Sequence, residues 1–422
     1  MSDPQAKLEH SVARLNSLLE VSRALAVEID LDPLLAVILE KAASILEAER
    51  STIFLYDPAV RTLRLHLSAE LARGSVVVPI GVGIAGHVAQ TREVLNIPDA
   101  YADARFNPQF DRETGFRTRS ILCAPLLSHK GDLVGVIQLL NRAGGGTFGE
   151  DTEEMLLAFA SVAGVAIDRA TLVEAALEAQ RVEESLRLAH DIQMSMLPRV
   201  LPTGPGLDLS ASLTPARSVG GDFYDVLKVG DRLWFAVGDA SGKGMGAALF
   251  TAMTLTLFRV AASIARDPGE ALARMNRELA RDNSSLMFVT VFAGVLDVAS
   301  GEVVYANAGH PAPYVLRSDR VHALDAPPST ALGVIEEVEY PLGRTALGPF
   351  EGLLLFTDGV TEAQSPAGAL WGTEPLEAFL REHRTGTCLT LTRELVARVK
   401  GFEAGAPPAD DLTVLALRRG PT

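Results

Sequence analysis

Four short acidic motifs punctuate the second half of this chain. They contain Asp222, which follows two glycines, Asp239, Asp358, and the adjacent pair Asp410 and Asp411. Apolar, strand-like runs lead into Asp239 and Asp358, and another leads out of Asp411. A carboxylate at the end of a buried strand is unfavourable unless its charge is compensated. Several carboxylates brought together would also raise one another's pKa. A bound divalent cation would remove both costs.

The residue types at these motifs indicate which metal and which reaction to expect. Carboxylates, backbone carbonyls and water are the ligands of Mg²⁺ or Mn²⁺, and no His/Cys cluster of the kind that binds zinc is present. Two such ions about 4 Å apart can activate a bridging water for in-line attack on a phosphate. Each motif alone is more often an aspartate in a turn, but the four together favour a two-metal phosphate hydrolase.

Other reactive residues compete poorly with this interpretation. Cys388 and Arg393 are one residue short of the spacing that cysteine phosphatases use, and both fall in a predicted helix. Cys123 is flanked by apolar residues and is predicted to be a core residue. Lys243 lies in a glycine-rich loop, but its glycines are spaced by three residues rather than four and Gly244 stands where a P-loop has Ser or Thr.

The elements around the motifs alternate between strand-like runs and paired helices, which predicts α+β sheets covered by helices. Strands are predicted over 207–213, 233–238, 288–297, 302–307, 312–316, 352–357 and 412–417, and helices over 246–266, 269–282, 373–383 and 388–402.

The first half has a different pattern, and a long helix follows it. Helices are predicted over 5–30 and 32–48, strands over 51–56, 62–67, 76–80, 120–127 and 133–140, and a long helix over 150–196. An apolar repeat along that helix fits a parallel two-stranded coiled coil. Its members are Leu172, Ala175, Ala179, Val182, Leu186, Ala189, Gln193 and Met196. A long helix packed on its own domain is the alternative. Three prolines between 198 and 205 then mark a domain boundary.

Composition limits the classes of protein to consider. The 422 residues suffice for two or three domains. A net charge of −15 disfavours nucleic acid as a partner. The apolar runs are shorter than a membrane helix requires, so no membrane segment is expected. Two cysteines exclude a disulfide framework, and we expect a cytoplasmic protein.

Residues from about 190 to 418 resemble the PPM metal-dependent Ser/Thr phosphatases, in the bacterial SpoIIE/RsbU branch. All four acidic motifs occur in the family's order, and residues 307–311 (Asn-Ala-Gly-His-Pro) add to the likeness. So do Ile192-Gln193 and the following Leu197-Pro198. The resemblance implies an αββα sandwich with two Mn²⁺ or Mg²⁺ ions between the sheets.

The same resemblance implies roles for individual residues. Asp222 and Asp239 would bridge the two ions, and the carbonyl of Ala240 would bind one of them. Asp358 and Asp410 would complete the second site, with Asp411 as the alternative to Asp410. Arg217, five residues before Asp222, would contact the substrate phosphate. His310 could be a general acid, although a histidine buried in a Gly-Pro loop is the commoner case.

The segment over about 31–170 resembles a GAF sensory domain. The motifs that carry the likeness lie at 103–107, 115–120 and 121–126, together with Asn141-Arg142, Phe148 and Glu153. Relatives that bind cyclic nucleotides have Lys in place of Arg142 and Asp in place of Thr152. The resemblance therefore implies either a small-molecule or cyclic-nucleotide site, or a dimerisation scaffold without a ligand.

Together these features predict four parts: an N-terminal helix (1–30), a GAF domain (31–170), a coiled-coil linker (171–197) and a phosphatase domain (198–418). We expect a homodimer joined through its helices. Its predicted activity is removal of phosphate from serine or threonine on a small STAS-type anti-anti-sigma protein, regulated by the GAF domain. Two alternatives stay open. The Gly-Gly-Asp-Phe sequence resembles a nucleotide-cyclase signature, and a phosphatase fold can serve as a non-catalytic docking module.

Overall fold

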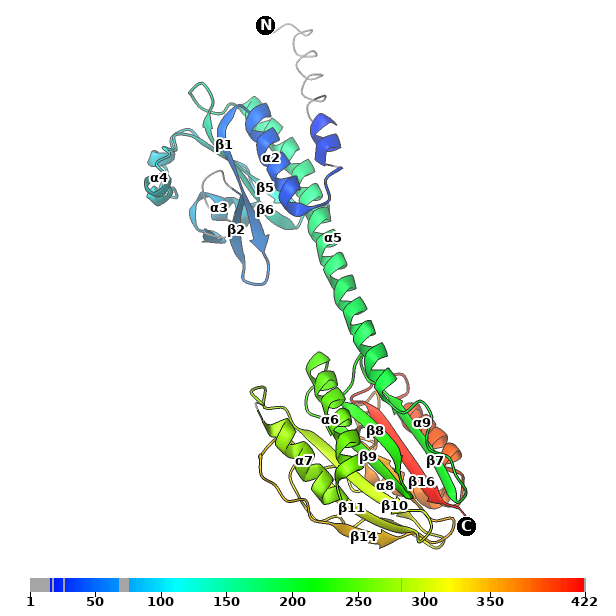
Figure 1. Ribbon diagram of the computed structural model, residues 1–422. Helices are drawn as coiled ribbons and strands as arrows, with labels where there is room; N and C mark the ends of the chain where they lie inside the picture. Colours follow the sequence, from blue (N-terminus) through cyan, green and yellow to red (C-terminus); the bar gives the residue numbers. More distant parts are fainter. Residues whose placement is uncertain (1–15, 17–18, 26, 68–75, 282, 421–422) are drawn as a thin grey trace. The chain divides into compact units, whose positions relative to one another are not determined.

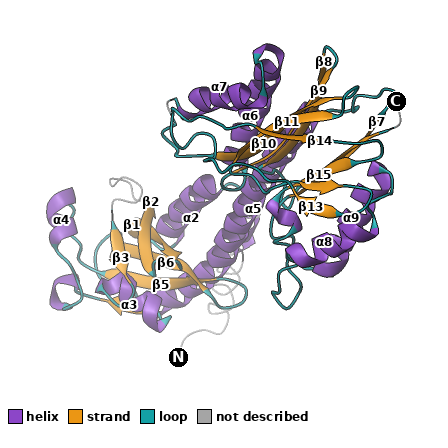
Figure 2. Cartoon of the chain, turned by 90° about the horizontal axis from the view of Figure 1, so that it is seen from below, coloured by secondary structure: helices purple, strands orange, loops and turns teal. Residues whose placement is uncertain are grey.

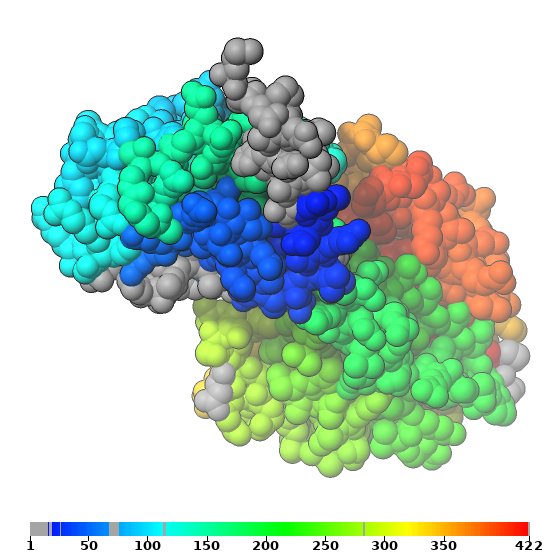
Figure 3. Space-filling view, turned by 90° about the horizontal axis from the view of Figure 1, so that it is seen from above, coloured from blue at the N-terminus to red at the C-terminus, as the bar shows by residue number. Residues whose placement is uncertain are grey.

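The computed structural model describes residues 16, 19–25, 27–67, 76–281 and 283–420, so most of the predicted helix over 5–30 lies outside the described residues. The chain divides after Arg181 into two units, each built from one continuous stretch of sequence (Figure 3).

The first unit is a six-stranded antiparallel sheet in the order β3-β2-β1-β6-β5-β4. Its elements are α2 (Leu31–Ile45), β1 (Ala48–Asp57), β2 (Thr62–Leu67), β3 (Val77–Pro79), α3 (Gly83–Thr91), β4 (Leu95–Ile97), η1 (Ala100–Ala102), α4 (Gln109–Thr114), β5 (Ile121–Leu127) and β6 (Leu133–Arg142), and α5 (Glu150–Met196) follows.

Helices cover both faces of this sheet. On one face α2 and the first part of α5 bury Leu34, Ile38 and Phe159 against β5 and β6. On the other face α3 buries Ile84 and Val88 in a second cluster. The alternating burial along β6 follows from the period of two in a strand, which sends successive side chains to opposite faces.

Helix α5 runs without a break through residues that belong to both units (Figure 1). Ala170 is the last residue of α5 in the hydrophobic core of the first unit. Near the other end of the helix, Gln193 and the following Leu197 are buried. Between 171 and 188 almost every side chain is exposed, including Leu172 and Val182 of the predicted coiled-coil repeat.

The second unit contains two five-stranded antiparallel sheets, in the orders β14-β11-β10-β9-β8 and β13-β12-β15-β16-β7. Its elements are β7 (Leu207–Thr214), β8 (Asp222–Val229), β9 (Arg232–Ala240), α6 (Met245–Ile264), α7 (Pro268–Ala280), β10 (Val289–Asp297), β11 (Glu302–Ala308), β12 (Tyr314–Leu316), β13 (Val321–Ala323), β14 (Gly343–Ala346), β15 (Gly352–Phe356), η2 (Asp358–Val360), α8 (Thr373–Glu382), α9 (Cys388–Glu403) and β16 (Leu412–Arg419).

These elements form four layers (Figure 2). Helices α6 and α7 cover the outer face of the first sheet, and α8 and α9 cover the outer face of the second. Between the sheets, Phe235 and Phe292 from one side meet Leu353 and Leu415 from the other. The predicted αββα sandwich is confirmed, because each sheet has one face that buries a helix pair and one that buries the partner sheet.

The predicted elements of the second unit are found close to their expected bounds, but β8 was missed. Its Asp225 and Lys228 interrupt the apolar alternation that identifies a strand, and its first residue follows two glycines. Asp225 is nevertheless fully buried, because Arg259 of α6 donates to it at 2.6 Å. The short strands β4, β13 and β14 were missed as well; they have only three or four residues each.

By length and hydropathy alone, α5 and α6 are long and apolar enough to cross a membrane, which the sequence analysis did not anticipate. About half of each apolar window is buried within the structure, 44% in α5 and 50% in α6. Helices that form the core of a domain have the same character.

Candidate active site

Asp222 and Asp239 are direct neighbours across two strands. The antiparallel register of β8 and β9 pairs them, Asp222 as the first residue of β8 and Asp239 near the end of β9. Side chains paired in this way lie roughly 5 Å apart, where like charges repel. Burial, followed by the charges of Asp239 and Asp411, raises the pKa of Asp222 well above its usual value. Burial and the charge of Asp358, followed by other carboxylates, raise the pKa of Asp239 to about 7.

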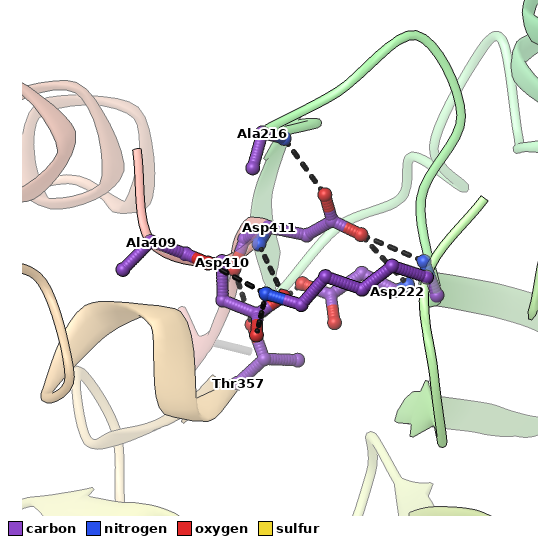
Figure 4. A network of polar contacts seen from close by, with 8 residues as sticks. Ala216, Asp222, Thr357, Ala409, Asp410 and Asp411 are labelled. Carbon is purple, nitrogen blue, oxygen red and sulfur yellow. Dashed lines mark hydrogen bonds and ion pairs between the residues drawn. The ribbon is translucent and has the colours of Figure 1, made fainter. Parts of the chain in front are cut away.

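Asp358 approaches this pair from the other sheet. It begins the single turn η2, directly after β15. Its neighbour Thr357 is buried, and the Thr357 hydroxyl donates to Asp222 Oδ2 at 2.6 Å, which ties the two sheets together (Figure 4). Burial raises the pKa of the Asp358 carboxyl, and the charges of Glu362 and Asp410 add to the effect.

Asp410 and Asp411 are adjacent but have different surroundings (Figure 4). Asp411 is buried, and its carboxylate accepts from the backbone N–H of Ala216 and of Gly221, both at 2.7 Å. It also accepts a longer hydrogen bond from the N–H of Asp222, at 3.4 Å. The Asp410 side chain is 38% exposed, and its Oδ2 lies 2.9 Å from Lys243 Nζ. Asp411 therefore holds the loop before β8, whereas Asp410 is partly exposed to solvent.

Glycines next to the aspartates permit this close approach. A Cβ on Gly220 would lie 2.2 Å from Asp411 Oδ2, and one on Gly221 would lie 2.6 Å from the carbonyl oxygen of Ala240. On Gly359 it would lie 1.9 Å from the carbonyl oxygen of Asp411. No heavy atom fits at such distances, so the carboxylates and the Ala240 carbonyl can gather here only because these positions have no side chain.

The glycine loop is also fastened from two helices. The Gln193 side chain of α5 forms two hydrogen bonds with Gly220: its Nε2 donates to the carbonyl at 2.7 Å, and its Oε1 accepts from the N–H at 3.2 Å. The Thr251 hydroxyl of α6 donates to the carbonyl of Gly221 at 2.6 Å. The position of Asp222, the next residue, consequently depends on the last turns of α5.

The donor set suits hard divalent cations. Asp222, Asp239, Asp358, Asp410 and the carbonyl of Ala240 supply oxygen ligands only, as Mg²⁺ and Mn²⁺ prefer. As the side chains are placed, no three acidic, His or Cys residues of the described chain converge on one point. However, Asp222 and Asp239 are carboxyls with strongly raised pKa values and little compensating charge. Bound cations would supply that charge, so the residues fit the metals that the sequence predicts.

The remaining predicted residues differ in their surroundings. Arg217 is exposed in the loop between β7 and β8, next to Ala216, whose N–H donates to Asp411. His310 is buried, and its Nδ1 lies 2.9 Å from the Thr290 hydroxyl. Burial lowers the pKa of His310 to about 3. Its burial and its contact with Thr290 favour the structural interpretation of His310 over a role as general acid.

Three contributors were not predicted from the sequence. Thr357 precedes Asp358 and was given no role, and Gln193 was placed in the coiled-coil repeat and in the family likeness without a role at the site. Lys243 was considered only as a P-loop lysine. Its Nζ donates to the carbonyl of Ala409 at 2.6 Å in addition to pairing with Asp410. A lysine in the same glycine-rich motif as Asp239 was the available signal for a cation at this site.

The first unit has a cavity of about 490 Å³ between its sheet and the α2, α3 and α4 segments. Its lining is mostly apolar and includes Phe54, Phe106, Phe110, Phe116, Leu39, Leu65, Val78, Ile84 and Leu140. Polar side chains at its rim are engaged with one another: Arg105 forms two hydrogen bonds with Asp103, and Asp111 accepts from the N–H and the hydroxyl of Thr118, both at 2.7 Å.

Asn141, part of the sequence that resembles a GAF domain, organises one edge of this cavity. It adopts a left-handed conformation with φ of 57°. Its Oδ1 accepts from the N–H of Arg119 at 2.6 Å, and its Nδ2 donates to Glu49 at 2.9 Å and to the Arg117 carbonyl at 3.0 Å. The side chain thus fixes the segment leading into β5.

Comparison with known families agrees with both units. Residues 229–420 match the family model described as Stage II sporulation protein E (SpoIIE), and residues 30–167 match that of the GAF domain. The first match begins after Asp222, so the first acidic motif lies outside it.

Individual relatives point the same way. A cGMP-specific 3',5'-cyclic phosphodiesterase of Drosophila erecta is 33% identical over 195 residues, which make up 41% of this chain but only 17% of that protein. Among solved structures, the SiaA-PP2C domain of Pseudomonas aeruginosa is 24% identical, with a TM-score of 0.51, over 57% of this chain and 98% of that one. The RsbU and RsbW domains of Rv1364c from Mycobacterium tuberculosis are 28% identical, with a TM-score of 0.47, over 54% of this chain and 64% of that one.

Each family match covers less than half of the chain: the first unit is similar to a GAF domain, and the second unit is similar to the SpoIIE family model and has the PP2C fold of the SiaA domain. The nucleotide-cyclase alternative is set aside, because Asp222 begins a strand of an αββα sandwich that also carries Asp358 and Asp410, two motifs for which that alternative does not account.

Proposed function

We propose that the protein is a signalling phosphatase that removes phosphate from serine or threonine on a small regulatory protein, using two Mn²⁺ or Mg²⁺ ions. The observation that carries the proposal is the direct pairing of Asp222 with Asp239, with Asp358 and Asp410 close by. The metals supply charge and an activated water when bound.

The chain's own residues then have separate tasks. Asp222 and Asp239 would be shared between the ions, Asp358 and Asp410 would complete the second site, and the Ala240 carbonyl would bind one ion. Asp411, Thr357 and Gln193 orient these ligands without contacting substrate. Such fixed orientation matters because small displacements of reacting groups cost large factors in rate.

We infer that the substrate is a phosphorylated STAS-type anti-anti-sigma protein. We also infer that the phosphatase itself is a cytoplasmic homodimer. The choice of substrate follows from the match to the SpoIIE family model.

The test of activity is hydrolysis of p-nitrophenyl phosphate and of a phosphorylated STAS protein, with and without Mn²⁺. We expect turnover that EDTA abolishes and that Asp239→Asn lacks. Lys228→Met is the matched control, because Lys228 is exposed six residues along β8 from Asp222. Wild-type-like activity in Asp239→Asn would overturn the metal-site assignment. Metal binding without turnover would favour the docking-module alternative.

We further infer that the GAF cavity takes a small ligand. Its volume of about 490 Å³ lies within the usual range for ligand sites, and its aromatic lining suits a planar molecule. The likeness to cGMP-specific phosphodiesterases makes cGMP and cAMP the first compounds to test. Titration calorimetry on the full chain should detect micromolar binding of one of them. Failure of both would leave the dimerisation-scaffold interpretation.

Helix α5 is the proposed route of regulation. An exposed helical segment such as 171–188 gains little stability alone, and a second copy packed along its apolar repeat would supply it. Since Gln193 of the same helix holds Gly220, a change in helix order would alter the position of Asp222. Gln193→Ala should weaken metal binding measured by calorimetry and leave GAF ligand binding unchanged. Equal metal affinity in the variant would remove Gln193 from the route.

A further inference from the structure

Lys243 is the cation placed against the predicted metal ligands. Its Nζ lies 2.9 Å from Asp410 Oδ2 and donates to the carbonyl of Ala409 at 2.6 Å. Of the adjacent pair, Asp410 is the more exposed carboxylate, with 38% of its side chain exposed, whereas Asp411 is buried. Lys243 therefore neutralises a carboxylate that the proposed function assigns to a divalent ion.

The backbone around Lys243 allows it to move. Ser241 is anchored, because its N–H donates to the Phe288 carbonyl at 2.8 Å and its hydroxyl accepts from the Phe288 N–H at 2.9 Å. Gly242 and Gly244, on either side of Lys243, have positive φ values of 87° and 84°, and a Cβ at either position would meet no atom within 4 Å. The side chain itself is 43% exposed. Since the Lys243 side chain is half-exposed and no packed atom surrounds the flanking glycines, we expect that it can turn away from Asp410 while Ser241 stays anchored.

Charge balance indicates which group the Lys243 ammonium would contact once Asp410 binds a metal. A phosphate group on the substrate is a dianion at neutral pH and needs positive charge beside the metals. Arg217, the cation predicted for this role, is exposed on the loop before β8. Lys243 lies in the same motif as Asp239 and Ala240, so it is already at the site when its carboxylate partner is taken by a metal.

We propose that Lys243 is an exchangeable counter-ion: it neutralises Asp410 in the metal-free protein, and on metal binding it is released to contact the phosphate of the substrate. The exchange is ionic and breaks no covalent bond. The inference rests on the proposed function, since it requires that Asp410 bind a metal.

One variant tests both parts of the proposal, because removal of the Lys243 charge should strengthen metal binding and weaken phosphate binding. In Lys243→Met, which keeps the length of the side chain and removes the charge, Mn²⁺ titrated calorimetrically in the absence of phosphate should bind about two- to fivefold more tightly, as expected for loss of a half-exposed ion pair. At saturating Mn²⁺, inorganic phosphate should inhibit p-nitrophenyl phosphate hydrolysis at least about tenfold more weakly, because a charged contact to the anion is lost.

Controls separate this exchange from a merely structural role. Lys243→Arg should restore both values, whereas Lys228→Met should change neither. If Lys243 only braced the loop, Lys243→Met would weaken metal and phosphate binding together, and that result would overturn the proposal. Unchanged Mn²⁺ affinity in Lys243→Met would overturn it alone. Absence of Mn²⁺ binding by the wild-type chain would instead overturn the proposed function and this inference with it.

Discussion

The phosphatase site and the GAF cavity are built on opposite physical terms. The phosphatase site brings several carboxylates together within a sheet sandwich, and it has no room to spare: a methyl group on Gly220, Gly221 or Gly359 would overlap neighbouring atoms. The GAF cavity is mostly apolar and has about 490 Å³ of open volume, and two of its charged lining residues have partners: Arg105 pairs with Asp103, and Asp111 accepts from Thr118. At the first site, carboxylates repel one another and a bound cation would relieve the repulsion. In the second, open volume is available to a ligand.

This difference indicates how each region should respond to change. A site held together against its own charge needs its ligand for stability, and it should gain stability when a charge is removed. A cavity that already has its polar groups paired should tolerate added volume and should depend little on pH. Each prediction below can contradict one side of that contrast.

The largest effect is expected from Asp239→Asn. Loss of Asp239, which we propose to be shared by two metals, should lower kcat/KM by at least about a hundred- to a thousandfold, the scale seen when one strong transition-state contact is removed. The same variant should raise the thermal stability of the metal-free protein at pH 7.5, because the pKa of Asp239 is about 7 and the amide carries no charge to repel Asp222. Activity assays and calorimetric melting check the two halves. A variant that is both inactive and less stable would contradict the electrostatic account.

The acidic site and the GAF cavity also differ in how much of each could be predicted from the sequence. The four acidic motifs predicted a candidate site, since aspartates beside glycines at strand ends are visible in a single sequence. Gln193, Thr357 and Lys243 could not be assigned, because their roles depend on contacts with Gly220, Asp222 and Asp410 that only the folded chain brings together. The strand β8 was missed because the sequence does not show that Arg259 pairs with Asp225, so Asp225 was not recognised as a buried residue. The cavity had no sequence signal of its own beyond the GAF resemblance.

The second prediction contrasts the two adjacent aspartates. Asp411→Ala leaves the N–H groups of Ala216 and Gly221 without their acceptor, so the free energy of unfolding should fall by about 2–4 kcal/mol. Asp410→Ala removes only a half-exposed ion pair and should change it by less than about 1 kcal/mol, while weakening Mn²⁺ binding. Urea unfolding of both metal-free variants makes the comparison. Equal destabilisation would show that the two carboxylates share one role.

The third prediction tests how tightly the site is packed. In Gly359→Ala the new Cβ would lie 1.9 Å from the carbonyl oxygen of Asp411, so the backbone must shift. We expect a loss of about 1–3 kcal/mol in unfolding free energy, together with weaker metal binding. Gly368→Ala in the same domain is no substitute control, because Gly368 has a positive φ of 78°. Gly401 in α9 has no atom within 4 Å of its ideal Cβ, and Gly401→Ala should be neutral or stabilising.

The fourth prediction concerns pH in the metal-free protein. A carboxyl whose pKa is raised on folding stabilises the fold fully below its unfolded pKa of about 3.9, and this contribution is lost as pH rises toward the folded pKa. For Asp239 that window ends near pH 7. Between pH 5 and 7, the free energy of unfolding should therefore fall by up to about 1.4 kcal/mol per pH unit from this group. Mn²⁺ should abolish the slope, and Asp239→Asn should reduce it. A flat profile without metal would show that the charge is compensated within the chain.

The smallest effect is expected at the GAF cavity. Ala43 of α2 lines the cavity, so the extra carbon atoms of Ala43→Leu have open volume to enter rather than a packed core. The free energy of unfolding should change by less than about 1 kcal/mol, in contrast to the loss expected from a single added carbon at Gly359. Any ligand of the cavity should bind more weakly, and metal-dependent activity without that ligand should be unchanged. Denaturant unfolding and calorimetry measure the two. A loss of stability as large as that of Gly359→Ala would mean that the cavity is as tightly specified as the metal site, and the contrast between space and charge would not hold.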